Sequence, residues 1–576
     1  MRHGSEYRRH CEVGALSARG PQPVKGAVKW FRVQILVPNF LRILDQYGSD
    51  SHTVRILMMR SVARACDSHL GRSAVQMTSE LRSRSVFSSL APSDGHELAE
   101  FAVMDANRVA QVVRRSQEVA AWWAERSWAE RERTLLRWAS WLMRHSDELV
   151  DLLMVEQGKS RDTAFLELVP TLEHIRWAAK HAKRVLGSRR MWAGAVMSNH
   201  TAEVEYRPYG VVGVIGPWNY PVFTPVGQMA AYALAAGNTV VLKPSEYTPR
   251  IGEFVVDAFA KANPDLPGGI LSLVTGFGET GAALCRSGVD KIAFTGSTAT
   301  GKRVLAACAD NLVPTVLECG GKDAMIVAAD ADVKAAAKAA AWGGMTNAGQ
   351  TCVGIEQVYV VAELADRFLD ELRSRLESVT AGDDAQSAYG PMTTPEQVDI
   401  VTRHIDDALT KGATAVVGGR ESVRAPYIDP VVLVDPADDS LAVTEETFGP
   451  VLVVRTVSDV DEAIELINGR KFGLGASVFS ARDGRRIAGR VRAGMVAVNC
   501  ALAFVGIPAL PFGGVGDSGF GRVHGADGLR EFAVAKSYAR QRFDTPGIDT
   551  VALRPTRLTM AAVRQMMRFR HERRMR

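Results

Sequence analysis

The fold is decided by a stretch that reads Ile292-Ala293-Phe294-Thr295-Gly296-Ser297-Thr298-Ala299-Thr300-Gly301-Lys302. An apolar run ends in a glycine turn, and the residues after it favour a helix from about Ser297, so the pattern predicts strand, turn and helix. A helix N-terminus directly after a strand suits a phosphate group. The stretch also fits the P-loop pattern, but Arg303 stands where a Ser or Thr would hold magnesium, so we reject a P-loop.

Two apolar runs further upstream also end in polar residues. Residues 210–215 precede Gly216-Pro217-Trp218-Asn219, and residues 239–242 precede Lys243-Pro244-Ser245-Glu246. Open α/β sheets bind ligands outside the carboxyl ends of their strands, which makes these segments candidates for a site. The Asn219 amide suits developing negative charge, and the Glu246 carboxylate suits ribose hydroxyls but would repel a 2′-phosphate. A plain turn and a salt-bridged loop are the competing interpretations.

Two shorter motifs carry less weight. Gly276-Phe277-Gly278-Glu279-Thr280-Gly281 fits G-x-G-x-x-G, which is weak evidence alone but is consistent with a tight turn near a nucleotide. Gly516-Asp517-Ser518-Gly519 is similar to a motif around a nucleophilic serine. Because the chain offers no base that can be paired with this serine, we reject a serine hydrolase.

A cysteine and a glutamate provide the candidate chemistry. Cys352 stands in Asn347-Ala348-Gly349-Gln350-Thr351-Cys352-Val353-Gly354, and Glu318 stands in Leu317-Glu318-Cys319-Gly320-Gly321-Lys322. A thiol can attack a carbonyl carbon, and a carboxylate can activate a water molecule. Either residue alone is weak evidence, because a single cysteine is usually a small buried hydrophobe and a single glutamate a solvated charge.

The Glu318 and Cys352 segments and the segments around Asn219, Lys243 and Gly296, in their order and separations, resemble the NAD(P)-dependent aldehyde dehydrogenase superfamily. Further similarity lies downstream in Glu445-Glu446-Thr447-Phe448-Gly449-Pro450-Val451, in Ala497-Val498-Asn499 and in the stretch 511–522. The resemblance covers residues from about 95 to about 545. It implies an α/β fold with a Rossmann-type cofactor domain, an α/β catalytic domain and a small β element for oligomerisation.

The resemblance implies a role for each matching residue. Cys352 would form a thiohemiacetal and then a thioester, Asn219 would stabilise the oxyanion, and Glu318 would activate the water that hydrolyses the thioester. The expected cofactor is NAD, with NADP as the alternative, and no metal is expected. The cofactor-binding residues implied are Trp218, Lys243, Glu246, Gly276, Gly296, Ser297, Glu446 and Phe448, while Lys322 and Glu445 are implied as supporting residues.

The predicted function is NAD-dependent oxidation of an aldehyde to the carboxylic acid. A coenzyme-A-acylating or semialdehyde dehydrogenase and a non-catalytic cofactor-binding relative remain the alternatives. Glu318 argues against the acylating branch, where hydrolysis must be suppressed. Phe223 and Trp342 favour an apolar entrance and therefore medium-chain or aromatic aldehydes.

The domain organisation follows the same resemblance. Residues 95–195 and 210–319 are expected to form the NAD-binding domain and 320–531 the catalytic domain. Strands at 196–209 and 532–545 are expected to pair and to join subunits into a homodimer or homotetramer. Local signals place helices after Asp105, after a Ser127–Glu130 capping box and from Ser146, and alternating strands and helices from about 173 to 310.

Composition restricts the class of protein. The chain has 576 residues and is 47% hydrophobic, so we expect more than one domain, and it contains no run of eighteen apolar residues. Its seven cysteines are scattered without metal spacing, which suits the reducing cytoplasm. The net charge of +5 is concentrated at the two ends, so we expect no affinity for nucleic acid.

The two basic ends are interpreted separately. Residues 1–76 hold twelve Arg or Lys against five Asp or Glu and show no period. They are expected to be disordered, to be a transit peptide, or to precede a natural start at Met77. Residues 554–576 predict a basic amphipathic helix, which can lie on an anionic membrane or on a partner surface; a solvated tail and a helix docked on the enzyme's own acidic body are the alternatives.

Overall fold

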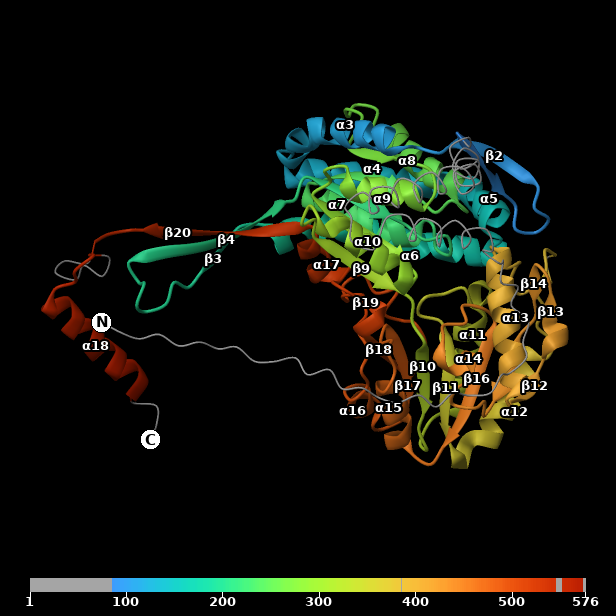
Figure 1. Ribbon diagram of the computed structural model, residues 1–576. Coiled ribbons are helices and arrows are strands. Elements are labelled where there is room, and N and C mark those ends of the chain that lie inside the picture. The colour runs from blue at the N-terminus through green and yellow to red at the C-terminus, as the bar shows by residue number, and fades with distance from the viewer. Residues whose placement is uncertain (1–84, 385, 545–551, 573–576) are drawn as a thin grey trace, which may run out of the picture. The chain divides into compact units, whose positions relative to one another are not determined.

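The computed structural model describes residues 85–384, 386–544 and 552–572, so the predictions for residues 1–76 lie outside the described residues. Figure 1 shows the arrangement of the elements. The first sheet has six strands in the order β19-β9-β8-β5-β6-β7. Five strands are parallel and the edge strand β19 is antiparallel: β5 (Val211–Ile215), β6 (Thr239–Lys243), β7 (Leu271–Leu273), β8 (Lys291–Gly296), β9 (Thr315–Cys319) and β19 (Gly519–Phe520).

Both faces of this sheet are covered by helices, because alternate side chains of each strand enter different cores. Val212 and Val214 of β5 pack with α4, α6 and α8, whereas Val211 and Ile215 pack with α3, α9 and α10. The helices on these faces are α3 (Ala106–Ala124), α4 (Trp128–Arg144), α5 (Ser146–Gln157), α6 (Arg161–Leu186), the π-helix η1 (Phe223–Ala230), α7 (Ala231–Ala236), α8 (Pro249–Ala262), α9 (Gly278–Arg286) and α10 (Thr298–Ala309). The doubly wound α/β arrangement is confirmed.

The predicted helix starts agree with the structure, and one prediction for the region beyond 173 was wrong. Asp105 caps α3, the Ser127 capping box begins α4, and α5 begins at Ser146. However, α6 continues to Leu186 through Pro170, where strands and helices were expected to alternate from about residue 173. Its buried face, which includes Ile175 and Ala178, stabilises the helix despite the proline.

The second sheet has seven strands in the order β12-β15-β16-β11-β10-β17-β18, all parallel except β12. Its strands are β10 (Asp323–Val327), β11 (Ile355–Val361), β12 (Thr414–Val417), β15 (Val431–Val434), β16 (Val451–Val457), β17 (Gly475–Phe479) and β18 (Met495–Val498). The helices of this half are α11 (Val333–Met345), η2 (Thr346–Gly349), η3 (Ala362–Leu364), α12 (Ala365–Leu376), α13 (Pro395–Thr410), η4 (Arg420–Ser422), α14 (Leu441–Thr444), α15 (Val460–Asn468), α16 (Gly484–Ala488) and η5 (Gly516–Ser518). The alanine-rich helix α11 is capped by Asp332.

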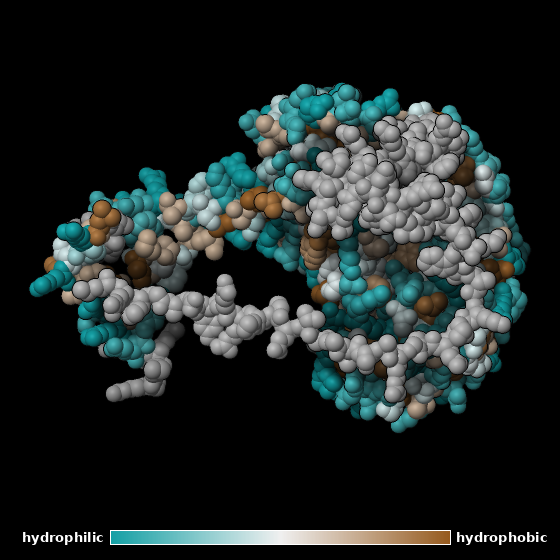
Figure 2. Space-filling view, in the orientation of Figure 1, coloured by the Kyte–Doolittle hydropathy of each residue, from teal (hydrophilic) through white to brown (hydrophobic). Residues whose placement is uncertain are grey.

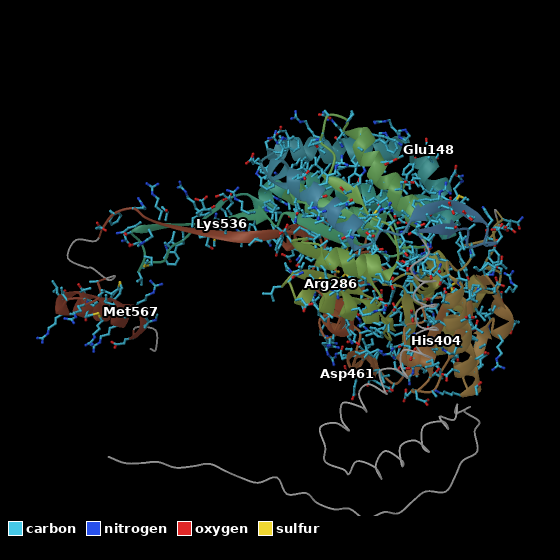
Figure 3. All side chains as sticks on the ribbon, turned by 45° about the horizontal axis from the view of Figure 1, so that its top comes forward. Glu148, Arg286, His404, Asp461, Lys536 and Met567 are labelled. Carbon is cyan, nitrogen blue, oxygen red and sulfur yellow. The ribbon has the colours of Figure 1, made fainter. Side chains whose placement is uncertain are left out.

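A third, antiparallel sheet has the order β20-β4-β3, from β20 (Ala533–Gln541), β4 (His200–Pro208) and β3 (Arg189–Met191). Ala533 pairs with Pro208 and the register continues to Gln541 opposite His200, so the expected pairing of these two segments is present within one chain. Eight of the nine β20 residues are exposed, among them Lys536, which is labelled in Figure 3. Two small hairpins complete the sheets: β1 (Val86–Leu90) with β2 (Glu97–Ala102), and β13 (Val423–Arg424) with β14 (Tyr427–Ile428).

The carboxyl-terminal helices are α17 (Gly525–Glu531), which precedes β20, and α18 (Arg557–His571). Hydrophilic residues dominate the coloured face in Figure 2. Within the described ranges no helix combines the length and apolarity needed to cross a bilayer. In the same part of the chain no group of three His, Cys, Asp or Glu is placed to hold a metal ion.

Candidate active site

The candidate nucleophile lies on a tightly built loop. Cys352 follows η2 and precedes β11, and Asn347 and Ala348 adopt left-handed backbone angles, with φ of 55° and 56°. Gly349 has φ of 71°, and a Cβ atom there would lie 2.0 Å from the carbonyl oxygen of Gly449. Because only glycine fits this approach, the loop is fixed against the Gly449 backbone.

Two cavities meet at Cys352. The first, which we call the strand-end cavity, has a volume of about 420 Å³ and lies at the carboxyl ends of β5, β6, β8 and β9. The second, which we call the apolar cavity, has a volume of about 370 Å³ and is lined by α6, η1, α11 and residues 501–512. Among the residues that the structure describes, Cys352 alone lines both. Its thiol can therefore meet ligands arriving from two sides.

The structure brings most of the predicted site residues to the first cavity. Eight of the eleven line it: Trp218, Asn219, Glu246, Gly296, Ser297, Cys352, Glu446 and Phe448. Lys243 lies outside the lining; its Nζ is buried 3.8 Å from Glu246 Oε2 and donates to the Pro244 carbonyl at 3.0 Å. Gly276 also lies outside it, packed against the Thr280 side chain, so its role as a cofactor residue stays a prediction.

Glu318, the third residue outside that lining, is a buried carboxyl on β9. Its Oε2 accepts a hydrogen bond from the Thr295 hydroxyl at 3.0 Å, and its Oε1 has no hydrogen-bond partner. Burial raises the pKa of Glu318 to about 8, and the Thr295 hydrogen bond and the charge of Arg522 oppose that rise. A carboxyl with a pKa near the working pH can act as a general base, and its unpartnered oxygen can accept a water molecule.

The electrostatics of Cys352 favour the neutral thiol in this state. Burial raises the pKa of Cys352, and the carboxyls of Glu318, Asp323 and Glu446 raise it further. The thiolate is the form that attacks a carbonyl, so a positive charge near the sulfur would favour the reaction.

Asn219 is held by hydrogen bonds to the loop that carries Cys352 and to Lys159. Its side-chain Nδ2 donates to the Gln350 carbonyl at 2.9 Å, and its backbone carbonyl accepts from Lys159 Nζ at 2.5 Å and from Asn347 Nδ2 at 3.1 Å. An asparagine amide has two N–H donors, so one remains for an oxyanion after the bond to Gln350. The network therefore fixes the amide beside the nucleophile loop.

Glu446 and Phe448 line the strand-end cavity and come from the segment after α14. Glu446 is partly buried, its Oε1 accepts from the Gly321 N–H at 3.0 Å, and desolvation raises its pKa to about 8. The Phe448 ring meets the Trp218 ring edge-on with 5.4 Å between centroids. A carboxyl and an aromatic face in one cavity suit a sugar hydroxyl and a planar ring.

Glu356, which sequence reasoning missed, holds this segment. Its carboxylate accepts from the backbone N–H groups of Thr447 and Phe448, each at 2.9 Å, and forms a buried ion pair with Lys322. Lys322 also donates to the Thr447 hydroxyl at 3.0 Å, which agrees with a supporting role. No local motif marks Glu356, because Lys322 lies 34 residues away in the chain and the two N–H groups lie 91 and 92 residues away.

The apolar cavity is lined mainly by hydrophobic side chains. Phe223 and Trp342 line it, together with Leu166, Val169, Val353, Leu502, Val505 and Phe512. No Lys, Arg or His is part of this lining among the described residues, and its two acids are Glu167 and Glu173. Leu166 and Trp342 are 57% and 51% exposed, so apolar surface continues from the cavity to the outside.

Ser518, the serine of the rejected hydrolase motif, has a structural place. It is fully buried, donates to the Gly320 carbonyl at 2.8 Å and accepts from the Gly473 N–H at 3.0 Å. Next to it, Gly519 of β19 pairs with Glu318 of β9. The motif thus attaches the second half of the chain to the strand that carries the candidate base.

Comparison with known proteins gives concordant results. The model of the aldehyde dehydrogenase family matches residues 79–538. The 4,4′-diapolycopene aldehyde oxidase of Methylomonas sp is 39% identical over 462 residues, covering 80% of this chain and 86% of the relative. A putative succinate-semialdehyde dehydrogenase [NADP(+)] of Mycolicibacterium smegmatis is 36% identical, covering 78% and 87%. The crystal structure of an NAD-dependent aldehyde dehydrogenase from Sinorhizobium meliloti aligns with a TM-score of 0.75 and 31% identity over 80% of this chain and 92% of that one.

Proposed function

The chain belongs to the aldehyde dehydrogenase family, and we propose that it oxidises an apolar aldehyde to the carboxylic acid with NAD as the hydride acceptor. As a member of that family it is an NAD(P)-dependent oxidoreductase acting on aldehydes. The observation that carries the proposal is the position of Cys352, where the strand-end cavity meets an apolar cavity without cationic side chains.

The residues of the strand-end cavity fit a dinucleotide. Ser297 caps the twelve-residue helix α10, whose N-terminus favours a phosphate group. The carboxyls of Glu246 and Glu446 line the same cavity and can accept hydrogen bonds from ribose hydroxyls. A nicotinamide bound in this cavity would supply the hydride acceptor for the oxidation.

The chain's own residues perform the remaining steps. The Cys352 thiol gives its proton to water, the thiolate sulfur forms a bond to the aldehyde carbon as the carbonyl π bond opens, and the resulting oxyanion accepts hydrogen bonds from Asn219 Nδ2 and the Cys352 N–H. Loss of the hydride leaves a thioester on Cys352. The Glu318 carboxylate then takes a proton from a water molecule, the water oxygen attacks the thioester carbon, and the C–S bond breaks to release the acid.

The preference for NAD over NADP rests on the charge around Glu246. Next to the strand-end cavity lies a larger cavity of about 1080 Å³, which shares Glu246 and Tyr247 with it. Its lining adds the acids Asp94, Glu100 and Asp399, and among the described residues it contains no Lys or Arg. A 2′-phosphate would therefore meet carboxylates, whereas two ribose hydroxyls can donate to Glu246.

The substrate preference rests on the apolar cavity. Of the two relatives, the name of one specifies a diapolycopene aldehyde and that of the other succinate semialdehyde, which carries a carboxylate. A carboxylate in a cavity without cationic side chains would stay unpaired, and this is costly, so the lining favours an apolar aldehyde. The exposed Leu166 and Trp342 at its edge suit a chain longer than the cavity itself.

Absorbance at the reduced-nicotinamide band tests this proposal, with NAD and NADP against decanal, an aromatic aldehyde and succinate semialdehyde. We expect turnover with decanal and NAD that is lost in Cys352→Ala. Turnover that is faster with succinate semialdehyde would overturn the substrate class. Turnover only with added coenzyme A would favour the acylating alternative, and cofactor binding without turnover would favour the non-catalytic one.

We also propose a homodimer or homotetramer, formed through the β20-β4-β3 sheet. β20 is an edge strand of this sheet, and its exposed residues include Val534 and Tyr538. An unpaired edge with exposed apolar side chains favours pairing with another chain. Light scattering tests this: a monomer that persists at micromolar concentration would contradict it.

The carboxyl-terminal helix supports the proposal of contact with an anionic membrane. At about 100° per residue, Arg557, Arg564 and Arg568 of α18 fall on one side, while Leu558 and Met566 fall on another. Met567 of this helix is labelled in Figure 3. Co-sedimentation with phosphatidylserine vesicles, weaker with phosphatidylcholine and lost on deleting 556–576, is the expected result.

The five described cysteines are all free, which supports a cytoplasmic location.

A further inference from the structure

A buried ion pair outside the sequence motifs quoted above lies next to the candidate oxyanion residue, Asn219. Lys159 stands between α5 and α6, and Glu167 lies in the second turn of α6. Their side chains are both fully buried, with 2.8 Å between Lys159 Nζ and Glu167 Oε2. Removing two charges from water costs several kcal/mol for each ion, so such a pair is weak evidence for stability and requires another explanation.

Both members of the pair hold the same five-residue segment. Lys159 Nζ donates to the Asn219 carbonyl at 2.5 Å and lies 4.4 Å from the centre of the Tyr220 ring. Glu167 Oε1 accepts from the backbone N–H groups of Val222 and Phe223, at 2.8 and 2.9 Å. Among these interactions, four of the residues 219–223 contact Lys159 or Glu167, and only Pro221 does not.

This segment separates the two cavities. Asn219 lines the strand-end cavity, while Tyr220 and Phe223 line the apolar cavity, as Glu167 does. A shift of the segment would therefore move the Asn219 amide and the wall of the substrate cavity together. Because a misplacement of about 1 Å can cost about 100-fold in rate, its position matters more than its stability.

We propose that Lys159 and Glu167 are positioning residues that act through Asn219: they fix residues 219–223 so that the amide stays aimed at the carbonyl oxygen on Cys352. The proposal rests on the function proposed above, since it assigns the pair to the step in which Asn219 receives the oxyanion. Neither residue touches the reacting atoms in this role. Their loss should lower kcat and leave the affinity for NAD unchanged.

The conservative test is Glu167→Gln, which keeps the volume and an acceptor for the two N–H groups but removes the charge. The stronger test is Lys159→Met, which removes the donor to Asn219. We expect kcat for decanal to fall roughly tenfold in the first and about 100-fold in the second, with KM for NAD within about threefold of the parent. Arg137→Met, which breaks the exposed ion pair with Asp265, is the matched control and should leave kcat unchanged.

A double-mutant cycle with Asn219→Ala separates positioning from stability. Removing an oxyanion donor costs about 100- to 1,000-fold in kcat, and in that background Lys159→Met or Glu167→Gln should cost less than about threefold. Losses that multiply would overturn the proposal, because the pair would then act independently of Asn219. If Lys159→Met does not fold, the cycle with Glu167→Gln decides alone.

The two proposals fail in different ways. A parent enzyme without Cys352-dependent turnover would overturn the proposed function and the positioning role with it. An active parent with multiplying losses, or with a kcat in Glu167→Gln equal to that of the control, would overturn the positioning role alone. Thermal unfolding of every variant shows whether a loss of kcat reflects loss of the folded enzyme.

Discussion

In the proposed mechanism, the pH dependence of thioester hydrolysis follows the ionisation of Glu318, which a hydrogen bond from Thr295 favours. Burial raises the pKa of this carboxyl to about 8, and the Thr295 hydroxyl, 3.0 Å from Oε2, lowers it from an even higher value. The base must be ionised to act, so its active fraction is about 0.09 at pH 7 and about 0.91 at pH 9. We therefore expect kcat to rise about tenfold between these pH values where hydrolysis limits turnover.

Thr295→Val removes the hydroxyl and keeps the shape of the side chain. A hydrogen bond to a charged group contributes about 1.5 kcal/mol or more, and a shift of one pKa unit corresponds to about 1.4 kcal/mol. The substitution should thus raise the pKa of Glu318 by about one unit. At pH 7 the ionised fraction, and with it kcat, should fall about tenfold, and the ascending limb should move to higher pH by the same unit.

The assay is NADH formation from decanal between pH 6 and 9.5. A rapid initial burst of NADH would show that thioester hydrolysis, and not hydride transfer, limits turnover. Glu318→Gln is the control and should show a low rate without the ascending limb. Superimposable profiles for the parent and Thr295→Val would refute the reasoning. A parent whose kcat is already constant from pH 6 would refute the raised pKa itself.

Three further predictions follow from the geometry. Cys352→Ser should abolish NADH formation and keep NAD binding, measured by calorimetry; residual turnover would exclude Cys352 as the nucleophile. Glu246→Gln should raise the ratio of kcat/KM for NADP to that for NAD by about tenfold, because it removes one charge near a 2′-phosphate; an unchanged ratio would show that Glu246 does not select the cofactor. Gly349→Ala should lower the Tm and the activity, because its Cβ would lie 2.0 Å from the Gly449 carbonyl oxygen; an unchanged Tm would mean that the two loops can separate.

Much of the fold was predictable because its signals are local. The Ser127–Glu130 capping box lies within four residues, and the strand, turn and helix around Ser297 lie between residues 291 and 309. Apolar runs and caps depend on neighbours along the chain, so they can be recognised without a structure. The continuation of α6 to Leu186 was missed because the helix is stabilised by packing of its buried face against the core, which local signals do not record.

The sequence by itself determined the family, the doubly wound α/β class and the identity of the candidate nucleophile, base and cofactor residues, because these appear as short motifs in a characteristic order. Only the tertiary structure decided what surrounds them. Lys159 meets Asn219 from 60 residues away, and Glu356 holds Phe448 from 92 residues away. Contacts at such separations leave no periodic or local trace, since they arise only when distant segments fold against each other.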